Sequence, residues 1–159
     1  MPRGKDHHYR LQLTWTGAED GPAEDYKTFS RAHRADFEGK ASLAMTADTA
    51  FMGDPEIHNP EEMLLLALSS CHMLSYLALA ALQGVTVVAY EDNASGIMHQ
   101  EGYSGRFTEV VLRPKVVLAA GSDLEVGEKL HGEANKTCFI ANSVNFPVRH
   151  EAEITCLPG

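Results

Sequence analysis

Residues 59–84 read NPEEMLLLALSSCHMLSYLALAALQG, and this stretch predicts one long helix. Asn59 can cap the first free amides, Pro60 suits the first helical position, and the two acids that follow favour the positive end of the helix dipole. Nothing before Gly84 breaks the helix, and Gly84 is a typical stop. Apolar residues cover nearly every face of residues 63–82, so we expect a central helix buried against more than one partner.

Shorter segments on either side of this helix have the alternation or the composition of β-strands. Apolar and polar residues alternate over residues 8–16, which is the period of a half-buried strand. Residues 85–90 and 106–119 are rich in β-branched residues, and Pro114 is expected to impose an edge, a bend or a bulge. The other expected elements are a strand pair around Phe37, Leu43 and Met45 with its turn at Glu38-Gly39, and a long hairpin connection over residues 92–105.

The C-terminal part of the sequence predicts a second helix and a closing strand. Ser122 can cap a helix over residues 123–136. Apolar and polar residues alternate over residues 146–156. Cys156 lies on the apolar face, so we expect its side chain to pack in the core. This order of elements predicts a single α+β domain over residues 1–159, with a long central helix and a second helix on a curved, largely antiparallel sheet.

Composition narrows the classes of function. The 159 residues are 44% hydrophobic, and 13 Lys and Arg against 22 Asp and Glu give a net charge of −9, which disfavours nucleic acid and anionic membranes as partners. The longest apolar run, residues 63–68, is shorter than the roughly 20 residues that cross a bilayer, so no transmembrane helix is predicted. The opening residues MPRGKDHHYR contain no apolar signal segment, which favours a cytoplasmic protein.

Three cysteines are too few for a disulfide framework, so each is core filler, a metal ligand or a reactive thiol. Cys71 lies within the long helix, where a small buried side chain is the ordinary interpretation. However, residues 69–72 (SSCH) form a polar cluster inside an apolar helix, which costs stability unless these groups find partners. Cys138 lies where the second helix meets a loop, and a helical thiol with a more mobile thiol is typical of an attacking and a resolving cysteine.

Two runs of sequence resemble the OsmC/Ohr family of cysteine-based peroxidases. These are HNPEEMLLLALSSCHMLSYL at residues 58–77 and KTCFIANSVNF at residues 136–146. The similarity extends from the HYRLQLTWTG segment to the VRHEAEI segment, which is nearly the whole chain, in the family's order of elements. It implies the family's fold, an intertwined homodimer, and activity on hydroperoxides, with organic ones preferred. The run after Cys138 differs from the Ohr branch, which has a turn containing Pro and Gly there, so the substrate preference does not transfer.

The resemblance also implies roles for individual residues. The helical cysteine of the family is the peroxidatic residue and the later one resolves it, which maps onto Cys71 and Cys138. The glutamate of the family's NPE motif falls on Glu61. An arginine from the segment after the first strand completes the family's site; Arg31 has the closer spacing, and Arg34 is the alternative.

The chemistry of a buried thiol explains why such a set is needed. Desolvation raises the pKa of a thiol on an apolar face, whereas only the thiolate attacks a peroxide oxygen, so the site needs a cation. An arginine keeps its proton, and its fork can hold a thiolate, a peroxide oxygen and a carboxylate such as Glu61 together. Glu61 also has a simpler explanation, since an acid in the first turn of a helix is favoured by the dipole alone.

A homodimer follows from the length of the helix. Ten residues separate Glu61 from Cys71, which is roughly 15 Å along a straight helix, too far for the two side chains to meet. Either Arg31 bridges this gap or a partner subunit supplies the glutamate. A helix that is apolar on almost all faces also exceeds what one sheet and one short helix can cover.

We therefore expect a thiol peroxidase that needs no cofactor or metal, with a hydroperoxide substrate and an external thiol as reductant, a dihydrolipoyl dithiol among the candidates. A Cys-His hydrolase is disfavoured, because Cys71 and its neighbour His72 point about 100° apart on a helix. Two other classes stay open: a Cys/His zinc site formed by Cys71, Cys138, His72 and His131, and a dimeric protein that binds a small hydrophobe and has inert cysteines.

Overall fold

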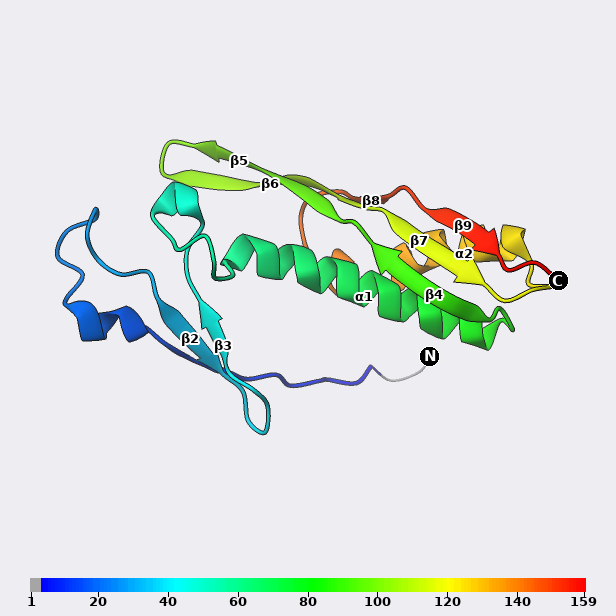
Figure 1. Cartoon of the computed structure of the whole chain (residues 1–159), viewed down its shortest axis with the longest axis horizontal. Helices are drawn as coiled ribbons and strands as arrows, with labels where there is room; N and C mark the ends of the chain where they lie inside the picture. Colours follow the sequence, from blue (N-terminus) through cyan, green and yellow to red (C-terminus); the bar gives the residue numbers. More distant parts are fainter. Residues whose placement is uncertain (1–3) are drawn as a thin grey trace. The chain divides into compact units, whose positions relative to one another are not determined.

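The computed structural model describes residues 4–159 and consists of two compact units, Met1–Met63 and Leu64–Gly159. The first unit contains a three-stranded antiparallel sheet in the order β1-β2-β3 (Figure 1). Its strands are β1 (Gln12–Thr14), β2 (His33–Asp36) and β3 (Leu43–Met45). One short 3-10 helix, Thr16–Asp20, lies between β1 and β2, and another, Thr49–Phe51, follows β3. The predicted strand pair with its turn at Glu38-Gly39 is confirmed, whereas the opening strand is shorter than residues 8–16.

Helix α1 (Pro60–Leu82) runs from the end of the first unit through the second. Its start and end lie within one or two residues of the prediction. The side chain of Asn59 accepts a hydrogen bond from the amide of Glu62, and Gly84 ends the helix in a left-handed conformation with φ +72°. The amide of Val85 then returns to the carbonyl of Ala80 at 2.9 Å, which satisfies one of the free carbonyls at the helix end.

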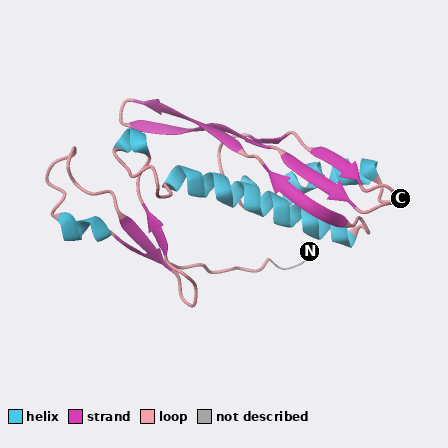
Figure 2. Ribbon diagram, viewed as in Figure 1, coloured by secondary structure: helices cyan, strands magenta, loops and turns pink. Residues whose placement is uncertain are grey.

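The second unit places α1 and α2 against two three-stranded sheets (Figures 1 and 2). Their bounds are β4 (Val87–Asp92), β5 (Ser95–Glu101), β6 (Ser104–Leu112), β7 (Pro114–Leu118), α2 (Leu124–Thr137), β8 (Val148–His150) and β9 (Glu153–Cys156). The strand orders are β4-β7-β9 and β5-β6-β8. Pairs β4–β7 and β5–β6 are antiparallel, whereas β6–β8 and β7–β9 are parallel, because α2 carries the chain back across the sheet. The α+β class is confirmed, with mixed pairing.

Three details of the predicted strands and caps were wrong. Residues 92–105 are not a plain connection, since β5 pairs along β6 there despite its polar sequence SGIMHQE. The closing strand is interrupted, because β8 and β9 extend two different neighbours, β6 and β7. Asp123, not Ser122, caps α2: its carboxylate accepts hydrogen bonds from the amides of Glu125 and Val126. The predicted bend at Pro114 is confirmed, as β6 ends and β7 begins there.

One face of α1 is buried and the opposite face is not. The buried residues recur every fourth position, namely Leu68, His72, Tyr76 and Ala80. The last two pack with residues of β7 and α2 such as Leu118, Leu130 and Ala134. On the opposite face Leu66, Leu74 and Leu82 are 56%, 59% and 83% exposed. This chain alone therefore covers about one face of a helix that is apolar all round.

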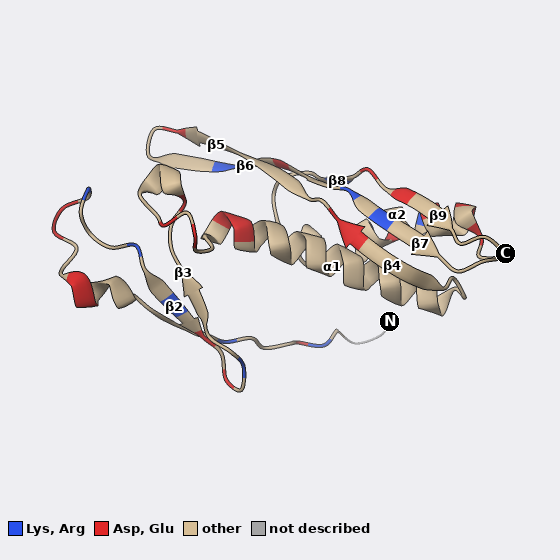
Figure 3. Ribbon diagram, viewed as in Figure 1, with Lys and Arg blue, Asp and Glu red and all other residues tan. Residues whose placement is uncertain are grey.

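Helix α1 is also long and apolar enough to cross a membrane by length and composition alone, with a mean hydropathy of 1.7. The prediction of no such helix counted only the run at residues 63–68, but the polar residues that follow are uncharged and lower the hydropathy little. Figure 3 shows that charge on α1 is confined to its first turn, at Glu61 and Glu62. The buried face of α1 nevertheless contacts the sheet and α2, as expected for a helix in a protein core.

Candidate active site

Two of the predicted residues lie together in the second unit. Cys71 lies in the middle of α1, and Cys138 is the first residue after the last turn of α2. Cys138 is 1% exposed, Cys71 is half-buried, and Cys71 is near enough to contribute to the pKa shift of the Cys138 thiol. Burial and the contact with Cys71 raise the pKa of the Cys138 thiol to about 11, so Cys138 is protonated at neutral pH. Cys156, in contrast, packs against the core from β9, as predicted.

The end of α2 fixes the direction of Cys138. The Cys138 amide still donates to the carbonyl of Ala134 at 2.9 Å, but the residue itself is extended, with φ −67° and ψ 113°. The chain therefore leaves the helix at this residue, and the amide of Ala141 approaches the Cys138 Sγ atom at 3.4 Å. The backbone on both sides of Cys138 is thus held while its side chain faces α1.

Three histidines from α1, α2 and β8 lie close to one another. Nε2 of His72 and Nδ1 of His131 are 3.0 Å apart, and both rings are buried. The ring of His150 lies 5.8 Å from each of these two rings. Burial, followed by the neighbouring histidines, lowers the pKa of His72 to about 4 and that of His131 to about 3, so both are neutral at pH 7. His72 faces His131, which agrees with the argument against a Cys-His pair.

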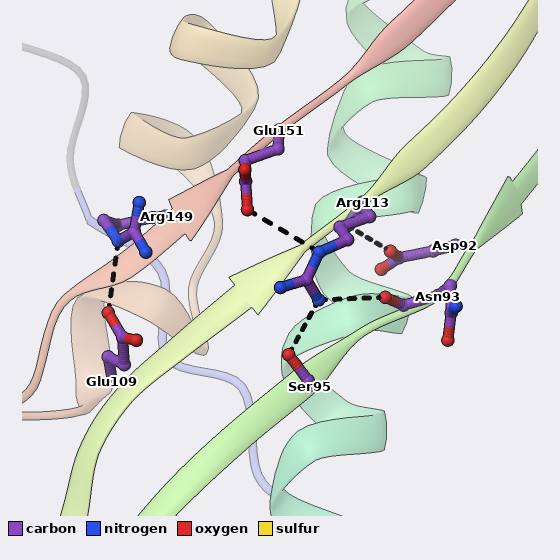
Figure 4. Close-up of polar contacts among 7 residues, drawn as sticks. All are labelled: Asp92, Asn93, Ser95, Glu109, Arg113, Arg149 and Glu151. Atoms are coloured by element: carbon purple, nitrogen blue, oxygen red, sulfur yellow. Dashed lines mark hydrogen bonds and ion pairs between the residues drawn. The ribbon is translucent and has the colours of Figure 1, made fainter.

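The remaining polar residues of the SSCH cluster include Ser69, which donates a 2.6 Å hydrogen bond to Asp92 at the end of β4. The other carboxylate oxygen of Asp92 accepts the amide of Arg113 at 2.6 Å. Figure 4 shows the Arg113 side chain between Ser95 and Glu151, and the two contacts measure 2.7 Å and 3.6 Å. This network therefore joins the β4–β5, β6–β7 and β8–β9 junctions. Ser69 and His72 of the predicted polar cluster therefore have partners.

Arg31 and Arg34 are held by their own unit. The guanidinium of Arg31 donates to the carbonyls of Phe29 and Tyr26, and its Cζ atom lies 3.6 Å from the centre of the Phe29 ring. Arg34 donates to both carboxylate oxygens of Asp36 at 3.0 Å, and its side chain is exposed. Arg34 is thus already paired with a carboxylate, whereas Arg31 is held by neutral groups and makes no ion pair within residues 4–159.

The two acids at the start of α1 have different surroundings. Glu62 completes a capping box, because its carboxylate lies 3.4 Å from the Asn59 amide while its own amide donates to the Asn59 side chain. In Glu61, the buried Oε2 atom has no hydrogen-bond partner among residues 4–159. Helix capping therefore accounts for Glu62 and leaves Glu61 free for another interaction. Because α1 is unbroken, the rise of roughly 15 Å between Glu61 and Cys71 applies.

The sequence interpretation missed several of these residues. It considered His72 and His131 only as zinc ligands, and the described residues contain no group of three or more His, Cys, Asp or Glu side chains placed to hold a metal ion. Asp92, Arg113 and His150 were not singled out at all. One signal was available for His131, since a spacing of seven residues places it on the same face of α2 as Cys138.

The family model described as OsmC-like protein matches residues 53–153. The chain belongs to the OsmC-like family. Among solved structures, an OsmC-like protein of unknown function from Vibrio cholerae is 35% identical, with a TM-score of 0.84 over 93% of this chain and 100% of that one. The uncharacterized protein YmaD of Bacillus subtilis is 24% identical over 97% of this chain and 97% of that one.

A more distant structure shares this OsmC-like fold. The organic hydroperoxide resistance protein of Elizabethkingia anophelis, solved with thiocyanate bound, is 15% identical, with a TM-score of 0.68 over 96% of this chain and 100% of that one. At this level of identity the likeness concerns the fold alone.

Proposed function

We propose that this OsmC-like protein is a thiol-dependent peroxidase that reduces organic hydroperoxides. The observation that carries the proposal is the proximity of Cys71, in the middle of α1, to the enclosed Cys138 at the end of α2. The Cys71 thiolate attacks the O–O bond; one oxygen becomes the sulfenic acid of Cys71 and the other leaves as an alcohol. The Cys138 thiol then attacks the Cys71 sulfur, water leaves, and a disulfide forms. An external thiol, such as a dihydrolipoyl dithiol, returns both cysteines to the reduced state.

The surroundings of the two thiols support this division of roles. Cys71 is half-buried and can meet a substrate, whereas Cys138 is almost completely enclosed. The raised pKa of Cys138 disfavours its thiolate, so Cys138 is the poorer nucleophile toward a peroxide. Attack by Cys71 and resolution by Cys138 therefore follow from exposure and protonation.

The proposal also requires a cation near the Cys71 thiolate. His72 is neutral at pH 7, so it does not supply this charge. Arg31 is our candidate, because no carboxylate compensates its guanidinium, whereas Arg34 is paired with Asp36. Glu61, with its unpartnered carboxylate oxygen, is the candidate for orienting the guanidinium.

We further propose that the active unit is a homodimer in the cytoplasm. The exposed face of α1, with Leu66, Leu74 and Leu82, is a continuous apolar stripe, and a second copy of the helix would cover it. Within one chain, Cys71 lies about 15 Å beyond Glu61 along the helix. A partner subunit would explain how Glu61 or Arg31 comes close to Cys71. A reducing compartment keeps both thiols ready for attack.

The names of related structures agree with this activity. Proteins of Legionella pneumophila and Elizabethkingia anophelis with the same fold are both described as organic hydroperoxide resistance proteins. These names support the substrate class, while the thiol pair supports the chemistry.

Intact mass and free-thiol counting before and after one equivalent of an organic hydroperoxide test the proposal. Loss of two thiols, with a disulfide mapped to Cys71 and Cys138, is the expected result. Unchanged thiols would contradict the proposal and favour a binding protein with inert cysteines. Zinc retained in native mass spectra of the purified protein would contradict it in favour of a metal site.

A further inference from the structure

The buried imidazoles of His72 and His131 are polar groups in the core that the proposed reaction does not use. Each histidine satisfies one nitrogen of the other, but Nε2 of His131 has no hydrogen-bond partner among residues 4–159. Burying polar atoms generally costs free energy. An apolar side chain at either position would fill the same space without this cost. The cost indicates that the pair contributes something other than stability.

The contacts between α1 and α2 include a line of α2 residues with the histidine pair in its middle. His131 bonds His72 and stacks on the ring of Tyr76, with 4.1 Å between the ring centroids. Gly127 accepts a hydrogen bond from the Tyr76 hydroxyl at 3.1 Å, and Cys138 lies near Cys71. The α2 residues in these contacts are spaced by four and seven, so they share one face of that helix. The contacts thus form a row between the two helices, with the thiols at one end.

Disulfide formation requires a narrow range of distances between the two cysteines at the end of this row. The Cβ atoms of two bonded cysteines must lie about 3.5–4.5 Å apart, and a larger separation requires movement of the backbone. Cys138 is seven residues beyond His131, roughly 10 Å along the helix axis. A small rotation or slide of α2 at His131 would therefore be carried to the thiol of Cys138. The directional hydrogen bond to His72 opposes both movements, whereas an apolar contact would oppose neither strongly.

We propose that His72 and His131 are positioning residues for the resolving step: their hydrogen bond holds α2 in the register that places Cys138 at Cys71. This inference rests on the proposed function and assigns the pair to disulfide formation, not to attack on the peroxide. In the step concerned, the Cys138 sulfur bonds to the Cys71 sulfur, the S–O bond of the sulfenic acid breaks, and the oxygen leaves as water with the thiol proton.

The test compares variants that remove or keep the hydrogen bond. His131→Leu and His72→Leu remove it. His131→Asn keeps an amide near the position of Nδ1, and His72→Gln keeps one near Nε2. His150→Leu is the matched control, since this third ring packs 5.8 Å from both others and its loss leaves the His72–His131 bond intact.

Rapid-quench mass spectrometry in a single turnover with an organic hydroperoxide separates the two steps. In His131→Leu and His72→Leu, we expect peroxide consumption within about twofold of wild type, and disulfide formation slowed at least about tenfold, with sulfenic and over-oxidised Cys71 accumulating. The Asn, Gln and His150→Leu variants should resolve at nearly the wild-type rate. Equal resolution in all variants would overturn the inference, as would a His150→Leu defect as large as that of His131→Leu.

A second measurement does not depend on peroxide chemistry. Equilibration with a dithiothreitol redox buffer gives the reduction potential of the Cys71–Cys138 pair. A tenfold loss of effective concentration in His131→Leu appears as a potential about 30 mV less negative. If the wild-type protein does not react with hydroperoxide but the reduction potential still shifts in His131→Leu, the proposed function fails and the positioning role stands. If the potentials are equal, the positioning role fails.

Folding is checked by circular dichroism at the assay temperature. If the leucine variants do not fold, His131→Asn and His131→Gln test the inference. Both side chains are polar, but the Asn amide lies near the position of the histidine Nδ1 atom and the Gln amide near that of Nε2. Fast resolution in Asn with slow resolution in Gln supports the inference, and equal rates overturn it.

Discussion

The hydroxyl of Ser69 donates a 2.6 Å hydrogen bond to Asp92, and this bond ties the middle of α1 to the bend of the sheet. Asp92 also accepts the amide of Arg113, so one carboxylate joins α1, β4 and the junction of β6 with β7. The position of Cys71, two residues beyond Ser69, therefore depends on a polar anchor on the sheet as well as on apolar packing.

Removing this anchor should reduce stability. Ser69→Ala leaves one oxygen of a partly buried carboxylate unsatisfied, and we expect a loss of about 1–3 kcal/mol in the free energy of unfolding. Urea unfolding at pH 7 measures the change. Ser70→Ala, one residue further on the same helix, controls for helix propensity and should change stability by less than about 0.5 kcal/mol. An equal effect of both substitutions would contradict the anchor.

The three cysteines should behave differently toward an organic hydroperoxide. Cys71→Ser should abolish peroxide consumption, because the attacking thiolate is absent. Cys138→Ser should allow one attack and then leave Cys71 as a sulfenic acid that is open to over-oxidation. Cys156→Ser should have little effect, since Cys156 only packs against the core. Mass spectrometry after one equivalent of peroxide measures the oxidation state of the cysteines in each of the three variants. Arrest of turnover by Cys156→Ser alone would refute the mechanism.

The charge of Arg31 should control the rate at which Cys71 attacks a hydroperoxide. Arg31→Met keeps part of the packing of the side chain but removes the cation that the proposal places near the thiolate, so the rate at neutral pH should fall at least about tenfold. Lysine at this position should rescue in part. Stopped-flow consumption of an organic hydroperoxide at pH 7 measures this rate.

Arg34→Met is the matched control for the arginine experiment. It breaks the ion pair with Asp36 and should leave the rate of peroxide consumption unchanged. A slower rate in Arg34→Met alone would transfer the role to Arg34. An unchanged rate in both variants would remove arginine from the proposal.

Acid should destabilise the protein through the buried histidines. The pKa values of His72 and His131 are about 4 and about 3 in the folded state, against about 6.5 when unfolded. Between these values the unfolded state binds more protons, so stability is complete above about pH 6.5 and falls as the pH decreases, by up to about 1.4 kcal/mol per pH unit for each imidazole. Urea midpoints from pH 7 to pH 4 test this, and His131→Leu should flatten the dependence.

Subunit complementation tests the dimer. Cys71→Ser and Glu61→Ala should each be impaired alone. If the site is shared, each mixed dimer contains one intact set of residues, so random exchange should restore about a quarter of wild-type activity. Failure to recover despite demonstrated exchange would place the whole site in one chain, and a monomer at working concentration would remove the dimer from the proposal.

Local signals explain what the sequence predicted well. Asn59, Pro60 and Gly84 marked both ends of α1, because capping and the left-handed stop depend on a few neighbouring residues. Pro114 marked the bend for the same reason, as it has no amide to donate. The predicted cap Ser122 is one residue early, since its neighbour Asp123 caps by the same chemistry and accepts the amides.

Long-range pairing explains what the sequence did not predict. Strand β5 has a polar sequence, and its strand conformation comes from pairing along β6. The closing strand divides because its two halves meet different neighbours, which alternation alone does not reveal. The contact of Cys71 with Cys138 was expected from the family resemblance, whereas the link from His72 to His131 joins residues 59 positions apart and had no local signal.

The parallel pairing of β9 with β7 has a consequence for biosynthesis. Helix α2 packs against β9, a strand that the ribosome makes after the helix. A nascent chain that ends shortly after Cys138 lacks this part of the surface on which α2 rests, so its two thiols are not yet held together. Chain termination before β9 should therefore yield a product whose Cys138 reacts readily with alkylating reagents, in contrast to the enclosed thiol of the finished protein.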